Sequence, residues 1–255
     1  MTKKLKCIIA THKTYEFPKV DYYVPIHVGK ARNNNELGIQ GDNEGDNISL
    51  KNGSFCELTA LYWAWKNDFF SDVEYTGLVH YRRYFNGQGL TLKDKGIASE
   101  DELLSYLKSA DCVVSKKRNY VIESVYEHYK NAHFAKDMDL TREIIAQNYA
   151  DYILAFDKVM SGKTLHLFNM FVMKKEMFYD YCEWMFDILF RLEQQVDISS
   201  YDTYQSRIFG FISERLFNVW LVKNNINLVE VKVTNIEGEN LVLKAINLLK
   251  RKFLK

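Results

Sequence analysis

Residues 75–85 read YTGLVHYRRYF, and this stretch decides how the rest of the chain is interpreted. The apolar run at residues 77–79 predicts a buried strand that stops abruptly at His80, Tyr81, Arg82 and Arg83. Charged side chains beside a buried strand need a partner, because burying an unpaired charge is costly. The stretch therefore predicts a strand that delivers cationic side chains to a site for an anionic group.

The composition is that of a soluble folded protein. The chain has 255 residues, of which 47% are hydrophobic and 26% charged, with two prolines and no Gly/Ser-rich linker, so we expect one α/β domain over residues 1–238. The net charge of +1 lacks the overall basic field of nucleic-acid binders, so no nucleic-acid partner is expected. Any anion site must be local.

The cysteines and the amino terminus bear on the cellular compartment. Four widely spaced cysteines form no CxxC motif, which disfavours structural zinc and favours free thiols in a reducing compartment. The apolar run at residues 7–10 is too short for a signal-peptide core, and no later run reaches the length of a membrane span. These features predict a cytoplasmic protein.

Strands and helices alternate in the first half. Apolar runs predict strands over residues 6–10, 25–28, 75–80 and 112–114, while capping boxes at Ser54/Glu57 and Ser99/Glu102 predict helix starts. Such alternation favours a mostly parallel central sheet flanked by helices. The second half is more helical, with apolar stripes over residues 145–160, 177–192 and 204–223 and a strand over residues 165–173 that Asn169 interrupts.

Three predicted strand ends are polar or basic. They carry Thr11-His12-Lys13, His80-Tyr81-Arg82-Arg83 and Lys116-Lys117-Arg118. Ligands of α/β sheets bind beyond the carboxyl ends of the strands, and arginine matches phosphate oxygens well, so a phosphate-bearing ligand is expected. No GxGxxG or GxxxxGK[ST] motif is present, which argues against Rossmann dinucleotide binding and P-loop hydrolysis. The alternative is that Arg82 and Arg83 pair with local acids such as Asp72 or Glu74.

Two further segments supply acidic candidates. The loop at residues 36–53 contains Gly-Asp-Asn twice, and Asp42 and Asp46 are candidates for a general base, for ribose binding or for metal binding; the alternative is turn formation. In the predicted helix over residues 204–223, Arg207, Gly210 and Glu214 share one face. Glu214 is a second base candidate, with Arg207 or Arg215 keeping it charged; the alternatives are a surface ion pair and, at Gly210, a close helix-packing contact.

The chain resembles a family of bacterial capsular and exopolysaccharide biosynthesis proteins, DUF4422, which are regarded as glycosyltransferases. The resemblance spans roughly residues 5–235 and rests on the segments ATHK, PIHVG, QGDNEGDNIS, FCELTALYWAWKN, GLVHYRRYF and SERLFNVWL. It implies a GT-A-like fold and a nucleotide-sugar donor. It does not identify the sugar.

Many GT-A enzymes hold a divalent metal with an Asp-x-Asp motif at the strand end that here reads His80-Tyr81-Arg82-Arg83. We therefore predict that cationic side chains replace the metal and that no cofactor is required, with Mg²⁺ or Mn²⁺ as the alternative. The candidate residues are expected to fall into three groups. The catalytic group is Asp42, Asp46, His80, Arg82, Arg83 and Glu214; the donor-binding group is Thr11, His12, Lys13, Asn43, Asn47, Tyr81 and Arg207; the acceptor-side group is His128, His133 and Asn169.

The expected reaction is transfer of a hexose, with galactose (pyranose or furanose) as the first choice, from a UDP-sugar to a growing capsular or exopolysaccharide repeat unit. The alternative is a non-catalytic sugar- or nucleotide-binding module that accompanies a separate transferase. Residues 239–255 form a basic amphipathic segment. We expect it either to lie on the inner membrane surface beside a lipid-linked oligosaccharide acceptor or to pack on the domain.

Overall fold

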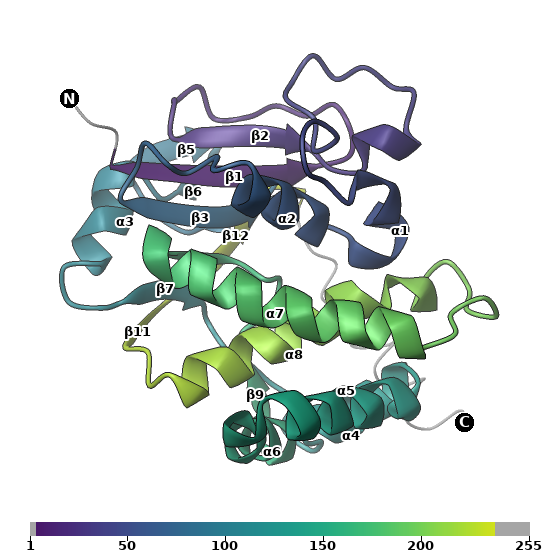
Figure 1. Cartoon of the computed structure of the whole chain (residues 1–255). Coiled ribbons are helices and arrows are strands. Elements are labelled where there is room, and N and C mark those ends of the chain that lie inside the picture. The colour runs from purple at the N-terminus through teal and green to yellow at the C-terminus, as the bar shows by residue number, and fades with distance from the viewer. Residues whose placement is uncertain (1–3, 238–255) are drawn as a thin grey trace.

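The structure, a computed structural model, describes residues 4–237 and is built around a central sheet (Figure 1). Six strands cross this sheet in the order β11 (Leu228–Val231), β7 (Cys112–Ser115), β10 (Phe171–Lys174), β3 (Tyr75–His80), β1 (Leu5–Thr11) and β2 (Tyr23–His27). Two short strands, β4 (Arg83–Phe85) and β12 (Val233–Asn235), extend it beside β3. The strand predicted from the YTGLVH segment is confirmed as β3.

The sheet is mostly parallel, as predicted. β2, β1 and β3 are parallel neighbours, and β11 is parallel to β7. The exceptions are β10, which is antiparallel to both β3 and β7 and separates them, and the short strand β4, which is antiparallel to β3 and β12. In the pairing of β1 with β3, Ala10 lies opposite His80, so these two strands end at the same edge.

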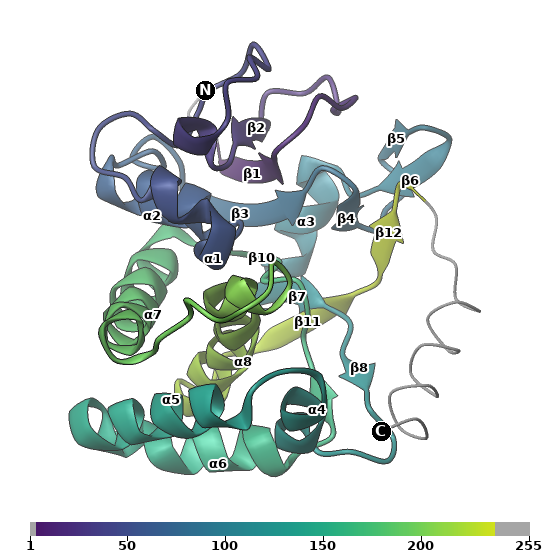
Figure 2. The ribbon, with the colours of Figure 1, turned by 90° about the vertical axis from the view of Figure 1, so that its right-hand side faces the viewer.

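Both faces of the sheet are covered, which explains why its strands read as continuous apolar runs. One face packs against α2 (Leu58–Lys66), α7 (Lys175–Gln195) and α8 (Ile208–Lys223); the other packs against α3 (Glu100–Tyr106) and the hairpin of β5 (Leu90–Leu92) and β6 (Lys95–Ile97) (Figure 2). Adjacent residues divide between the faces: Leu78 belongs to the first core cluster and Val79 to the second. Each face thus has its own apolar core.

A further helical layer lies below α8 in Figure 1 and consists of α4 (Val125–Ala132), α5 (Ala135–Asn148) and α6 (Ile153–Ser161). The single stripe predicted over residues 145–160 is wrong. The chain leaves the helix at Tyr149, and Ala150–Tyr152 form a 3₁₀ turn. Tyr149 and Tyr152 both pack on Trp184 of α7. The apolar residues that looked like one helix therefore belong to α5, the 3₁₀ turn and α6.

One predicted capping box is confirmed and the other is wrong. Ser99 accepts a hydrogen bond from the Glu102 backbone, and the Glu102 carboxylate accepts one from the Ser99 backbone. Ser54 instead lies inside the short helix α1 (Asn52–Phe55), where its hydroxyl donates to the Lys51 carbonyl. Because that turn begins earlier, Glu57 becomes the residue that precedes α2 and its carboxylate is available elsewhere.

The strand predicted over residues 165–173 is two strands. β9 (Thr164–Leu165) pairs with β8 (Arg118–Asn119), and β10 begins at Phe171. Between them Phe168 and Asn169 both have left-handed backbone conformations, with φ of 76° and 53°. A left-handed backbone conformation at two successive residues other than glycine costs conformational free energy, and it persists only where contacts with the surrounding structure stabilise it. This turn borders the site described next.

Residues 239–255, predicted to form a basic tail, lie outside the described residues. Over residues 4–237, no helix combines the length and the apolar character that crossing a bilayer requires.

Candidate active site

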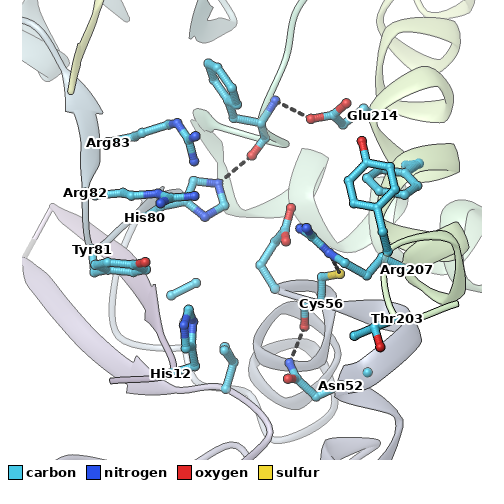
Figure 3. A pocket seen from close by; sticks show the side chains of 17 residues that line it. His12, Asn52, Cys56, His80, Tyr81, Arg82, Arg83, Thr203, Arg207 and Glu214 are labelled. Atoms are coloured by element: carbon cyan, nitrogen blue, oxygen red, sulfur yellow. Dashed lines mark hydrogen bonds between the residues drawn. The ribbon is translucent and has the colours of Figure 1, made fainter. Parts of the chain in front are cut away.

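A cavity of about 610 Å³ opens at the edge where β1 and β3 end. Figure 3 shows two facing walls, one of side chains from the strand ends and the other from the segment that leads into α8 and from the first turns of α8. The strand-end wall carries His12, His80, Tyr81, Arg82 and Arg83, the helix wall carries Thr203, Tyr204, Arg207, Phe211 and Glu214, and Asn52, Cys56, Glu57 and Phe168 also line the cavity. Seven predicted site residues therefore meet in one cavity.

The two histidines of the strand-end wall are neutral near pH 7. Burial lowers the pKa of His80, and Arg83 and Arg82 lower it further, against the opposing influence of Glu57 and the Phe168 carbonyl. Burial also lowers the pKa of His12, assisted by the neighbouring Lys13 and Arg82. The positive charge of the cavity is thus carried by arginines, while the imidazoles offer neutral hydrogen-bonding groups.

The two strand-end arginines do not pair with Asp72 or Glu74. Arg82 Nη1 lies 3.3 Å from Glu237 Oε2, and Asp72 pairs with Lys6 instead. The Arg83 guanidinium carbon lies 4.5 Å from the centre of the Phe168 ring, a cation–π contact. Both guanidinium groups line the cavity, as the basic strand end predicted.

Glu214 has a structural partner at each oxygen. Oε1 accepts a hydrogen bond of 2.8 Å from the Phe168 backbone, and Oε2 lies 3.2 Å from Arg215 Nη1. Burial raises the pKa of Glu214, and the nearby Glu57 adds to this, while Arg215 opposes it. Of the two arginines proposed to hold Glu214, the structure selects Arg215.

Arg207 contacts a cysteine that the sequence did not single out. Its Nε lies 3.3 Å from Cys56 Sγ (Figure 3), and burial raises the pKa of this thiol to about 11. Cys56 packs so closely on α8 that a Cβ at Gly210 would lie 3.0 Å from its sulfur. The glycine on the Arg207 face therefore allows a helix-packing contact, the alternative that the sequence left open.

The two Gly-Asp-Asn segments, residues 41–43 and 45–47, lie outside the cavity lining. Asp42 is fully buried and accepts hydrogen bonds from the backbones of Gly29 and Lys30 and from the Ser49 hydroxyl. Asp46 accepts a bond from the Tyr62 hydroxyl, and the Asn47 amide donates to the Asn43 carbonyl within the turn. The hypothesis that Asp42 or Asp46 is the base does not fit this geometry, because their carboxylates hold the loop together and do not reach the cavity.

Other predicted donor-binding residues lie at the margin. The Thr11 hydroxyl is buried in a turn with the Lys13 carbonyl, and Lys13 Nζ lies 3.2 Å from Glu237 and 4.9 Å from the centre of the Tyr81 ring. Lys116–Arg118, the third basic strand end, is absent from the lining because β10 separates β7 from β3. Two strand ends, not three, build the site.

The acceptor-side candidates do not line the cavity either. His133 stacks on Phe211 with ring centres 4.2 Å apart and so supports the helix wall from behind. His128 stacks on Tyr120 with centres 4.0 Å apart, away from the cavity. Asn169 is buried, and its amide donates to Glu57 and to Ser213. Asn169 thus contacts the lining residue Glu57 without itself lining the cavity.

Sequence reasoning missed several lining residues: Asn52, Cys56, Glu57, Phe168, Thr203, Tyr204 and Phe211. Glu57 was assigned to helix capping, which concealed it, although it lies in the FCELTALYWAWKN segment that carries the family resemblance. Phe168 and Tyr204 lie in segments whose aromatic content is typical of a core. Across residues 4–237, no group of three or more His, Cys, Asp or Glu side chains is arranged to hold a metal ion.

Comparisons with known proteins place this geometry in context. No curated protein matches the chain. One solved structure, described as the apo structure of WbbM, a bifunctional glycosyltransferase, is 31% identical with a TM-score of 0.84; the match covers 93% of this chain and 46% of that chain. This chain therefore spans less than half the length of WbbM. Residues 6–225 match the family described as "Domain of unknown function (DUF4422)", so the chain belongs to the DUF4422 family.

Proposed function

We propose that this chain is a glycosyltransferase that transfers a hexose from a UDP-sugar to a growing capsular or exopolysaccharide repeat unit. The observation that carries the proposal is the convergence of Arg82, Arg83 and Arg207 on one cavity at the edge of the sheet. The likeness to WbbM, a bifunctional glycosyltransferase, supports the same class of reaction. Galactose, as pyranose or furanose, is the donor sugar to test first.

The diphosphate of the donor binds between the two walls. Arginine presents a planar set of donors that suits phosphate oxygens, and charge-assisted hydrogen bonds are about twice as strong as neutral ones. When the bond between the sugar and the diphosphate breaks, negative charge grows on the departing UDP. Preorganised guanidinium groups stabilise that charge in the transition state, which is the effect that accelerates the reaction.

We propose that this arrangement operates without a divalent metal. Three guanidinium groups supply the positive charge that a metal ion would otherwise place on the diphosphate. The test is turnover in EDTA. Unchanged activity is expected, whereas loss in EDTA with recovery on adding Mg²⁺ or Mn²⁺ would overturn this part of the proposal.

The acceptor is proposed to be a lipid-linked oligosaccharide, so the enzyme works at the cytoplasmic face of the membrane. Transfer to such an acceptor requires peripheral contact only. The measurement is co-sedimentation with vesicles that contain an anionic lipid, and no sedimentation would remove the membrane part of the proposal while leaving the reaction intact.

The central experiment compares basic residues that line the cavity with basic residues that lie outside it. The affinity for UDP, and the release of UDP from UDP-galactose with water as acceptor, are measured for the unchanged chain and for Arg82→Ala, Arg83→Ala and Arg207→Ala. Each loss of a charged hydrogen-bond donor is expected to weaken UDP binding about 10-fold or more. Lys117→Ala and Arg118→Ala, at the strand end outside the cavity, are the matched controls.

Two outcomes would reject the proposal. If UDP binds tightly but no nucleotide sugar in a panel is turned over, the chain is a non-catalytic binding module. If the cavity variants and the control variants lose affinity equally, the cavity is not the donor site.

A further inference from the structure

We propose that Glu57 is the general base of the transfer reaction and that Asn169 is the residue that positions it. The inference rests on the proposed function and deepens it, because it assigns the group that activates the acceptor hydroxyl. Neither residue was expected in this role: Glu57 was assigned to helix capping and Asn169 to acceptor binding.

The hydrogen bonds of the two carboxylates that line the described cavity distinguish them. Both oxygens of Glu214 are occupied, one by the Phe168 backbone and the other by Arg215. Glu57 uses only Oε1, which accepts a bond of 2.8 Å from Asn169 Nδ2. Within residues 4–237, Glu57 Oε2 has no hydrogen-bond partner, so it is the carboxylate oxygen that a substrate hydroxyl can reach.

The position of Glu57 also suits the role. Glu57 lines the same cavity as His80 of the strand-end wall and Arg207 and Glu214 of the helix wall. A base in that position faces the sugar, while the arginines face the diphosphate. Asp42 and Asp46, the earlier candidates, lie outside the cavity lining.

Asn169 holds the Glu57 carboxylate in a defined orientation. Its Nδ2 donates to Glu57 Oε1 and, at 3.0 Å, to Ser213 Oγ, which itself donates to the Gly210 carbonyl of α8. The Asn169 side chain is buried, and its backbone is held in the left-handed region. Glu57 Oε1 and Ser213 Oγ both accept hydrogen bonds from the Asn169 side chain, so the NH₂ end of the Asn169 amide, and not its oxygen, faces Glu57.

Both walls secure the turn that carries Asn169. The Phe168 carbonyl oxygen lies 2.6 Å from His80 Nε2, and the Phe168 amide donates to Glu214 (Figure 3). Strain of this kind, held by several partners at a cavity, is a feature of preorganised sites. The strained turn therefore has a function, which is to place the Asn169 amide against Glu57.

Glu57 Oε2 takes the proton of the acceptor hydroxyl as the acceptor oxygen forms a bond to the anomeric carbon of the donor. The bond from that carbon to the diphosphate oxygen breaks, and its electron pair leaves on UDP between Arg82, Arg83 and Arg207. Attack from the face opposite the leaving group inverts the anomeric centre, so an α-linked donor gives a β-configured product.

The test uses the full chain, with UDP-galactose as donor and water as acceptor. Glu57→Gln keeps the shape and the acceptor oxygen that faces Asn169 but removes the base. Loss of a general base costs about 100-fold or more in turnover, and UDP affinity is expected to stay within about 3-fold of the unchanged chain. Asp46→Asn, which removes a carboxylate outside the cavity, is the matched control and is expected to keep its turnover.

Asn169→Ala tests the positioning role. It is expected to lower kcat by about 10-fold or more while leaving the KM for UDP-galactose nearly unchanged. Formate added to Glu57→Ala is expected to restore part of the turnover, because a small carboxylate can occupy the vacated position. A purely structural role for Glu57 would show no rescue by formate.

The stereochemistry supplies an independent reading. NMR of the galactose first released from UDP-α-galactose should show the β anomer before mutarotation. Release of the α anomer, or turnover by Glu57→Gln close to that of the unchanged chain, overturns the assignment of Glu57 while the transferase proposal stands. A chain that binds no UDP and releases none overturns both.

Discussion

His80 Nε2 and the carbonyl oxygen of Phe168 lie 2.6 Å apart, and this contact joins the strand-end wall of the cavity to the turn that carries Asn169. A carbonyl oxygen only accepts hydrogen bonds, so Nε2 carries the proton and donates it. Because the pKa of His80 is lowered, chiefly by burial, the ring remains neutral near pH 7 with its proton on this nitrogen. The contact thus defines the tautomer of His80.

The lowered pKa of His80 predicts a pH-dependent stability. The unfolded chain takes up a proton as the pH falls below about 6.5, whereas the folded chain does not until its own lower pKa is reached. The free energy of unfolding should therefore decrease in that window, by up to about 1.4 kcal/mol per pH unit for one histidine. Urea unfolding between pH 5 and 8 measures it.

His80→Gln is the matched variant, since its amide can still donate to the Phe168 carbonyl. Its stability should fall less steeply with decreasing pH than that of the unchanged chain. His12, whose pKa is also lowered, and Glu214, whose raised pKa acts in the opposite direction, contribute equally to both proteins and cancel in the difference. Parallel curves would mean that His80 takes up its proton at the same pH in the folded and unfolded chains.

Asp42→Ala should destabilise the protein without removing the chemistry. Three donors point at this buried carboxylate, and losing hydrogen bonds to a charged group costs about 1.5–3 kcal/mol each, with incomplete additivity. We expect the free energy of unfolding to fall by about 3 kcal/mol or more and kcat of the folded fraction to stay within about 3-fold. A fully stable variant without activity would restore Asp42 as a catalytic candidate.

The cationic wall was predictable because its determinants are local. A buried strand that ends in His80-Tyr81-Arg82-Arg83 must deliver those side chains to the edge of the sheet. Arg207 and Glu214 were predictable as a pair because helical spacing places them on one face. These parts of the site follow from periodicity and from which residues terminate an element.

The remaining parts depend on contacts between distant segments. The strand β10 enters the sheet from residue 171 and separates two strands that come earlier in the chain, so the Lys116–Arg118 segment lies away from the cavity. Glu57 had the spacing of a capping residue, and only the position of α1 shows that this role is absent. In the Gly-Asp-Asn segments only Asn47 follows the alternative of turn formation; Asp42 and Asp46 accept hydrogen bonds from other segments of the chain, which the local sequence does not reveal.

Cys56 provides a test of backbone strain beside Glu57. Its backbone has φ of 52° and ψ of −132°, a conformation that glycine adopts far more readily than other residues. Cys56→Ala and Cys56→Gly both delete the thiol that contacts Arg207, and they differ only in the Cβ atom. The glycine variant should be the more stable of the two by about 1 kcal/mol in urea unfolding, because relief of strain outweighs the added freedom of the unfolded chain. A more stable alanine variant would show that the strain is absent.

Glu237 pairs with two cations at the rim of the cavity, Lys13 at 3.2 Å and Arg82 at 3.3 Å, so it would compete for Arg82 with the diphosphate of the proposed donor. Glu237→Gln should therefore bind UDP about 2–5-fold more tightly at low salt, since exposed ion pairs are weak and the competition is modest. The gain should shrink as added salt screens the charges. Titration calorimetry with UDP measures both effects.

The control is the same substitution in an Arg82→Ala background. There Glu237→Gln should not increase the affinity for UDP, because the guanidinium group that Glu237 pairs with is absent. An increase that persists in this background would show that Glu237 acts through Lys13 and not through Arg82.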